Sequence, residues 1–138
     1  MNHSDRFASR VFRWSAIYGL LALLPLYFLE ETLGQRFPPA FNRPEQFYGF
    51  LGVAVAWQFA FLLIAKDVPR YRLFMLPAAA EKFLSSGAAL VLYASGRINV
   101  ATVTPSAIDF VIGCLFLAAY FISAQPSEGV VPSKKNAA

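Results

Sequence analysis

The chain of 138 residues contains one cysteine, Cys114, and one histidine, His3. A single cysteine excludes a disulfide within the chain and a CxxC redox centre. One cysteine and one histidine also argue against a haem, zinc or copper site, and a Ser-His-Asp triad would lack a plausible base. We therefore expect no metal site and no cofactor. Cys114 lies in an apolar block, where a free cysteine is ordinarily a small core residue.

Charge is also scarce. Charged residues make up 14% of the chain and apolar residues 57%, against about 25% and about 45–50% in soluble domains. The apolar residues gather in four blocks, each close to the length of about 20 residues that a helix needs to cross a bilayer. A soluble bundle would need a polar face on every helix, and residues 109–122, DFVIGCLFLAAYFI, provide none. The sequence predicts an all-α fold, a four-helix transmembrane bundle forming a single membrane domain over residues 1–138.

The predicted spans cover residues 11–30, 47–65, 72–95 and 105–123. The first block lacks an A-x-A-like cleavage site after it, which favours an uncleaved span over a signal peptide. Pro69 disfavours helical geometry at Val68 and predicts the break before the third span. Gly96 suits the position after that helix, and Thr104 and Pro105 suit the N-cap and first position of the fourth.

Residues 31–46 are rich in proline and aromatic residues, and predict a loop that lies against the membrane surface or covers a cavity as a lid. Residues 125–138 have the composition of a disordered tail. Most basic residues fall on the side that would hold both termini and the hinge at residues 66–72, whereas the other side holds Arg36, Arg43 and Arg97. This bias predicts a multi-pass protein of a bacterial inner (plasma) membrane with cytoplasmic N- and C-termini.

The third block carries an ionisable pair, Glu81 and Lys82, where a charge is costly and often functional. Counted from the basic residues at the cytoplasmic edge, Glu81 and Gln58 both lie roughly 12–14 Å deep. Tyr18 falls at a similar depth, and Ser85 shares a helix face with Glu81. We therefore predict a polar intramembrane layer, a candidate binding or proton site, formed by Tyr18, Gln58, Glu81 and Ser85, with Lys82 beside it.

Lys82 is about 100° around the helix from Glu81, so the pair is not expected to face each other. The lysine side chain is expected to extend toward the interface or to find another partner. Asp109, four residues after Pro105, is predicted to be an acid near the outer edge, favoured by the helix dipole. Glu81 and Asp109 are then expected at different depths, roughly 8–10 Å apart.

The spacing of the spans, the hinge KDVPRYR (66–72) and the following MLPAAAEK (75–82) resemble small four-span inner-membrane proteins of bacteria and, more distantly, DoxX-like proteins. The resemblance implies a fold and a location only. Small multidrug-resistance transporters are similar in size, but their essential acid lies in the first span. The first span here has no internal acid, so their mechanism is not transferred.

Three functions stay open. The first is a structural or accessory protein that packs with itself or with a larger membrane complex, which the small residues Gly52, Ala56 and Ala60 on one helix face favour. The second is a proton-coupled carrier that uses Glu81. The third is a membrane enzyme that acts on a lipid or quinone. The expected partners are the lipid bilayer and a homo-oligomeric or other membrane-protein partner. Nucleic acid is not expected, because the basic residues lie at the ends of apolar blocks.

Overall fold

The computed structural model describes residues 3–36 and 43–123, and every regular element in these residues is a helix. In chain order they are α1 (His3–Leu23), η1 (Leu24–Phe28), α2 (Glu30–Arg36), α3 (Pro44–Lys66), α4 (Val68–Tyr71), η2 (Arg72–Phe74), α5 (Met75–Ala94) and α6 (Val100–Ser123). Four stretches are long and apolar enough to cross a membrane: His3–Phe28, Pro44–Lys66, Val68–Ala94 and Val100–Ser123. The predicted all-α fold with four candidate spans is confirmed.

The helix starts differ from the predicted ones. Helix α1 begins at His3, so most of the polar lead before residue 11 is helical, and α2 lies within the predicted loop of residues 31–46. Helix α6 begins at Val100, because the side chain of Asn99 accepts a hydrogen bond from the Thr102 backbone amide at 3.0 Å. The prediction of an N-cap at Thr104 was therefore wrong. Pro105 lies inside the helix, as membrane helices tolerate.

The two other predicted breaks are helix ends in the structure. Helix α3 ends at Lys66 and α4 begins at Val68, so the break lies at Asp67, one residue earlier than predicted. The Asp67 carboxylate accepts a hydrogen bond from the Arg70 amide at 3.3 Å, which caps the new helix. Gly96 follows the end of α5 with a φ of 70°, as predicted, a conformation that glycine adopts without strain.

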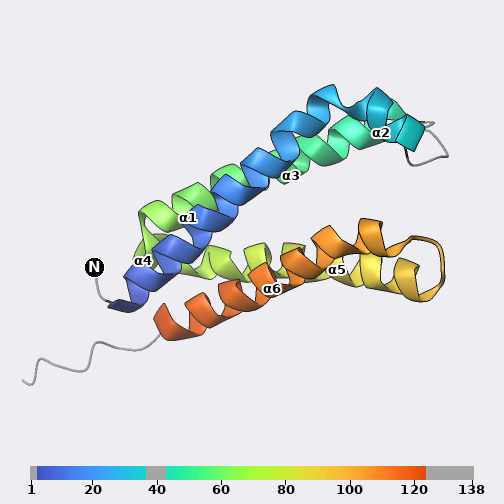
Figure 1. Cartoon of the computed structure of the whole chain (residues 1–138). Helices are drawn as coiled ribbons and strands as arrows, with labels where there is room; N and C mark the ends of the chain where they lie inside the picture. The colour runs from blue at the N-terminus through green and yellow to red at the C-terminus, as the bar shows by residue number, and fades with distance from the viewer. Residues whose placement is uncertain (1–2, 37–42, 124–138) are drawn as a thin grey trace, which may run out of the picture.

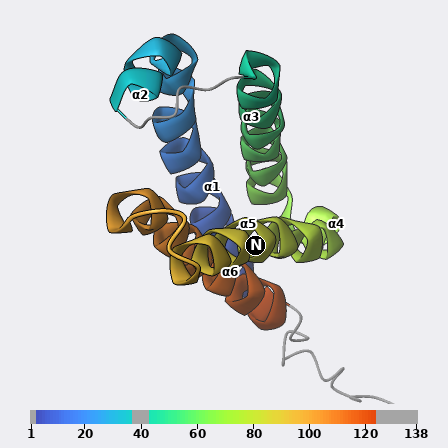
Figure 2. The same ribbon diagram turned by 90° about the vertical axis from the view of Figure 1, so that its right-hand side faces the viewer.

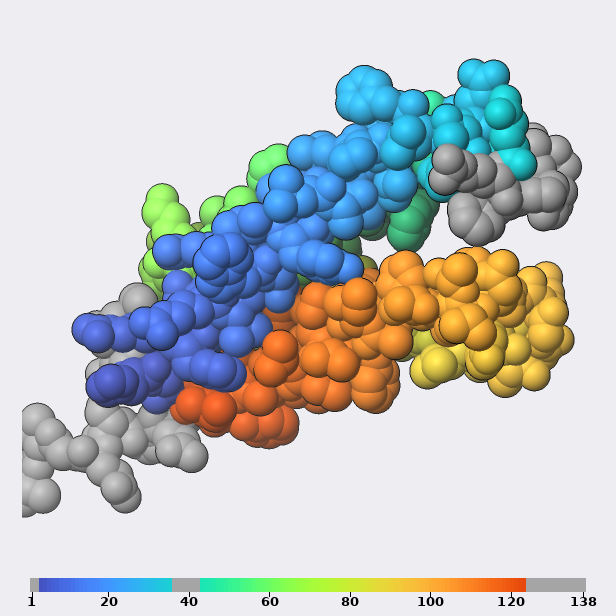
Figure 3. All heavy atoms as spheres, in the orientation of Figure 1, coloured from blue at the N-terminus to red at the C-terminus, as the bar shows by residue number. Residues whose placement is uncertain are grey.

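The four long helices form two antiparallel pairs, α1 with α3 and α5 with α6 (Figures 1 and 2). The pairs meet at the end of the molecule that holds the N-terminus and α4, and they diverge toward the other end (Figure 1). The space-filling view shows the molecule open between the pairs at that far end (Figure 3). The fold is therefore a bundle at one end only, which we call the closed end; the other is the open end.

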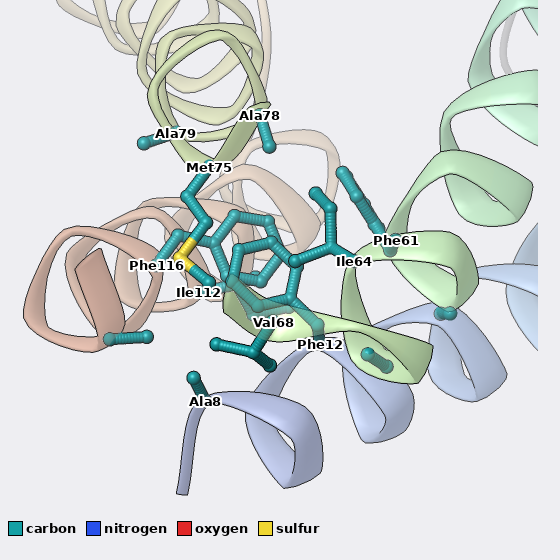
Figure 4. Packing of buried hydrophobic residues seen from close by; sticks show 13 residues of the cluster. Ala8, Phe12, Phe61, Ile64, Val68, Met75, Ala78, Ala79, Ile112 and Phe116 are labelled. Carbon is teal, nitrogen blue, oxygen red and sulfur yellow. The ribbon is translucent and has the colours of Figure 1, made fainter. Parts of the chain in front are cut away.

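The hydrophobic core lies at the closed end (Figure 4). Three buried rings join three helices there: Phe12 of α1 stacks on Phe116 of α6 with centroids 4.0 Å apart, and both contact Phe61 of α3 edge-on. The Ser9 hydroxyl also donates a 2.6 Å hydrogen bond to the Ala65 carbonyl, joining α1 to α3. Aromatic packing thus fixes the pairs to each other at the closed end.

Cys114 is a correction to the sequence analysis. Its side chain is exposed, rather than part of the core. On α6 the buried positions are Ile112, Gly113, Phe116 and Ala119. Cys114 therefore lies outside the stripe that packs inward, on the outer surface of α6. The predicted tail, residues 125–138, lies outside the described residues.

Candidate functional site

Lys82 is the centre of an ionic cluster just beyond the aromatic core. Its side chain is only 9% exposed, and its Nζ lies 3.1 Å from Asp109 Oδ1 and 3.5 Å from Glu81 Oε2. The same Nζ lies 5.7 Å from the centroid of the Phe61 ring, a cation–π distance. One ammonium therefore holds two carboxyl groups between α5 and α6. The Phe61 ring of α3 lies on another side of the same ammonium. We call Glu81, Lys82 and Asp109 the ionic cluster.

A glycine allows the cluster to form. A Cβ added to Gly113 of α6 would lie 3.1 Å from the Cβ of Lys82 and 3.2 Å from the Phe83 ring. Any larger residue would therefore require the Lys82 or Phe83 side chain to shift by a few tenths of an ångström. Gly113 is one helical turn from Asp109, so the close approach brings the Asp109 carboxylate within reach of Lys82. Sequence reasoning missed Gly113, although its spacing of four residues from an intramembrane acid was a readable signal.

The cluster corrects three predictions. Glu81 and Lys82 do interact, because the long lysine side chain spans the 100° between adjacent helical positions. Asp109 is not a separate acid at the outer edge: since α6 begins at Val100, Asp109 lies well inside the helix and pairs with Lys82. The expected separation in depth between the two carboxyl groups is also wrong, since both lie within 3.5 Å of one nitrogen.

The cluster holds one more acid than base. Glu81 Oε2 is buried and accepts no hydrogen bond, although it lies near the ammonium. Asp109 takes the shorter contact with Lys82, which leaves Glu81 the less satisfied of the two acids. A buried oxygen without a donor is costly, and more so where water is scarce. Glu81 Oε2 is therefore the oxygen of the cluster that is still open to a hydrogen-bond donor.

Gln58 lies in the other helix pair, between α1 and α3. It is 2% exposed, and its Nε2 donates a 2.9 Å hydrogen bond to the Ala54 carbonyl of its own helix. Its side chain covers Gly19 of α1 so closely that a Cβ there would overlap the amide group. Gly19 is a second glycine that the sequence analysis did not single out.

The remaining members of the predicted polar layer lie elsewhere. The Tyr18 side chain is at the surface, with 42% of the residue exposed. Ser85 is also exposed, and its hydroxyl donates to the Lys82 carbonyl within α5 at 3.1 Å. The structure thus places Lys82 and Gln58 inside, Glu81 and Asp109 half-buried, and Tyr18 and Ser85 outside.

The small-residue face of α3 is left unpacked. Gly52 and Ala56 are exposed, and Ala60 is half-buried. Ala56 and Ala60 of this face line a shallow apolar groove of about 270 Å³ between α3 and η2, together with Val53, Trp57 and Phe74. No charged residue lines this groove. It therefore offers a shallow, neutral surface along α3.

Known proteins give no further guide to the site. In residues 3–36 and 43–123, no three His, Cys, Asp or Glu side chains lie close enough to hold a metal ion. Comparisons with protein-family models, with curated proteins and with solved structures found no match.

Proposed function

We propose that the chain is a small integral protein of a bacterial inner membrane, with cytoplasmic termini, and that it has a structural or accessory role in which α3 pairs with a second copy. The observation that carries the pairing is the unpacked small-residue face of α3 and its groove. Close helix approach in a membrane depends on such faces, because lipid gives no hydrophobic drive for association.

A second copy fits this groove better than a charged helix would. The middle of α3, residues 47–65, contains no Asp, Glu, Lys or Arg, whereas α5 and α6 carry the ionic cluster. Gly52, Ala56 and Ala60 recur every four residues, so the same stripe on another copy presents a matching flat surface. Trp57 and Phe74 form the walls of the groove and supply the larger contact area.

Disulfide trapping in membranes tests the pairing. In a C114S background, which removes the exposed native cysteine, A56C is expected to form a crosslinked dimer on mild oxidation. The matched control is L84C, because Leu84 of α5 is 75% exposed and does not line the groove. The expected result is dimer with A56C and monomer with L84C.

A bulky variant completes the test. A56L fills the groove from its own side and is expected to abolish the dimer while leaving the monomer's helix content unchanged. Equal crosslinking of A56C and L84C, or a dimer that survives A56L, contradicts pairing through α3. A crosslink from A56C to a different protein contradicts the choice of partner.

A second candidate function, a proton-coupled carrier, is favoured by a separate observation. Glu81 is the surplus acid of the ionic cluster, and its Oε2 is buried without a hydrogen bond. A carboxyl group in this state can take up a proton or exchange it for a cationic substrate.

Charge removal at Glu81 distinguishes the two candidate functions. E81Q is expected to leave dimer trapping through A56C intact, because Glu81 does not line the groove. The carrier role predicts that E81Q abolishes proton release when a cationic substrate is added to reconstituted vesicles, while E31Q, at an exposed acid, does not. Equal proton release by both variants contradicts the carrier.

A further inference from the structure

Helix α1 carries a basic stripe, Arg6, Arg10 and Arg13, at its N-terminal end. Positions i, i+4 and i+7 lie on one helical face, and all three residues are exposed. The opposite side of the same turns holds Ala8 and Phe12, which point into the core (Figure 4). The Ser9 hydroxyl is bonded to Ala65 of α3, which fixes the rotation of α1 and keeps the stripe outward.

The stripe is not neutralised within the described residues. The salt bridges there join Arg43 to Glu45, and Lys82 to Glu81 and to Asp109; none includes an arginine of the stripe. The guanidinium groups on this face are therefore available to an anion from outside the described chain. Guanidinium suits phosphate in particular, because its planar fork of donors matches two oxygens.

The surroundings of the stripe select a lipid as the source of that phosphate. Exposed Trp14 and Phe7, with 68% and 38% of each residue exposed, lie next to the stripe around the helix. Tryptophan at the edge of an apolar span marks the headgroup level. The arginine side chains point toward the helix N-terminus. The side chain of Arg13 therefore reaches the headgroup level, although its backbone lies deeper in the membrane.

We infer that the basic stripe of α1 is a binding surface for the headgroup of an anionic phospholipid in the leaflet at the closed end. The phosphate accepts hydrogen bonds from the arginines, and the acyl chains lie along Trp14. This inference does not depend on pairing through α3, because the stripe and the groove are on different helices.

Fluorescence quenching tests the surface with the full chain. W57F leaves Trp14 as the one tryptophan, because the sequence has two. In phosphatidylcholine vesicles, a minor fraction of brominated phosphatidylglycerol is expected to quench Trp14 more than the same fraction of brominated phosphatidylcholine. R10Q/R13Q should lower the local enrichment of the anionic lipid by about fivefold for each guanidinium removed. The matched control, R43Q/R97Q, has the same charge change at the open end and should leave quenching unchanged.

Each result of the quenching experiment either supports or overturns the lipid-binding surface. Equal quenching by the two brominated lipids in W57F overturns the inference. A fall in quenching as large with R43Q/R97Q as with R10Q/R13Q also overturns it, because the effect then follows net charge. If W57F fails to accumulate, the lipid retained by the wild-type chain after detergent extraction gives the answer. Wild type is expected to retain more phosphatidylglycerol than R10Q/R13Q, and equal retention refutes the surface.

Discussion

At the scale of the residue, Lys82 holds the two carboxyl groups of the ionic cluster, and its position follows from packing. A lysine between helices needs a partner because its charge is poorly solvated. Here Asp109 comes from the neighbouring helix and Glu81 from the preceding position. The destabilisation caused by removing one member of the cluster should therefore depend on which charges remain without a partner.

Removing the lysine is predicted to be the most harmful single change in the cluster. K82M leaves two acids without a counter-charge and should destabilise the fold by about 3 kcal/mol. D109N should cost less, because Lys82 keeps Glu81 as a partner. Thermal unfolding in detergent, followed by circular dichroism, measures the order. Equal midpoints for K82M and wild type would contradict a stabilising role for Lys82.

The two glycines Gly113 and Gly87 give a matched pair of predictions. Alanine is the better helix former, by roughly 1 kcal/mol. Nothing lies within 4 Å of a Cβ added at Gly87, so G87A should stabilise α5. At Gly113 the added Cβ would press on Lys82 and Phe83 at 3.1–3.2 Å, so G113A should lose that gain or reverse its sign. The midpoint of thermal unfolding distinguishes these outcomes. A higher midpoint for both G87A and G113A would show that α5 and α6 have room to separate.

At the scale of the element, each helix pair contains one tight approach at a glycine. In the α1–α3 pair, Gly19 lies beneath the Gln58 side chain; in the α5–α6 pair, Gly113 lies against Lys82. Both glycines place a backbone against a buried polar side chain. Small residues thus bring polar groups into the interior, and these polar groups are held by the helix that carries them or by its neighbour.

The α1–α3 approach is predicted to show strong coupling between Gly19 and Gln58. G19A displaces the amide and breaks its hydrogen bond to the Ala54 carbonyl, at a cost of roughly 1–3 kcal/mol. In G19A/Q58A the added methyl group no longer meets an amide, so most of that loss should be recovered. A double-mutant cycle on unfolding free energies measures the coupling. If the effects of G19A and Q58A on the unfolding free energy are additive, the Gln58 side chain moves aside without loss of stability.

The sequence predicted the helices better than their contacts. Hydropathy identified the four spans, and the glycine after residue 95 was read correctly because its role is local. The start of α6 was misread, because Thr104-Pro105 matched a helix start more closely than Asn99 did. That error misplaced Asp109, and so the lysine's main partner was not predicted. Pairing across helices depends on register and rotation, which a single chain's pattern does not specify.

At the scale of the whole molecule, basic residues concentrate at the closed end. Arg6, Arg10 and Arg13 of α1 lie there with Lys66 and Arg70, while Arg43 and Arg97 lie at the open end. A membrane protein orients with its basic loops in the cytoplasm. The closed end should therefore face the cytoplasm.

Cysteine labelling tests this orientation. In the C114S background, R43C is expected to react with a membrane-impermeant maleimide added to intact cells. K66C should react only after the inner membrane is opened, because Lys66 lies at the closed end. Labelling of both positions from the same side would exclude the four-span topology. Labelling of K66C alone in intact cells would reverse the orientation.

The divergence of the two helix pairs has a mechanical consequence for the bilayer. Since the pairs touch at one end and separate toward the other, the molecule has the form of a wedge (Figures 1 and 3). In the bilayer proposed for this chain, the leaflet at the open end would surround a wider outline than the leaflet at the closed end. In a flat membrane this wedge would produce bending stress, which curvature away from the open end would relieve.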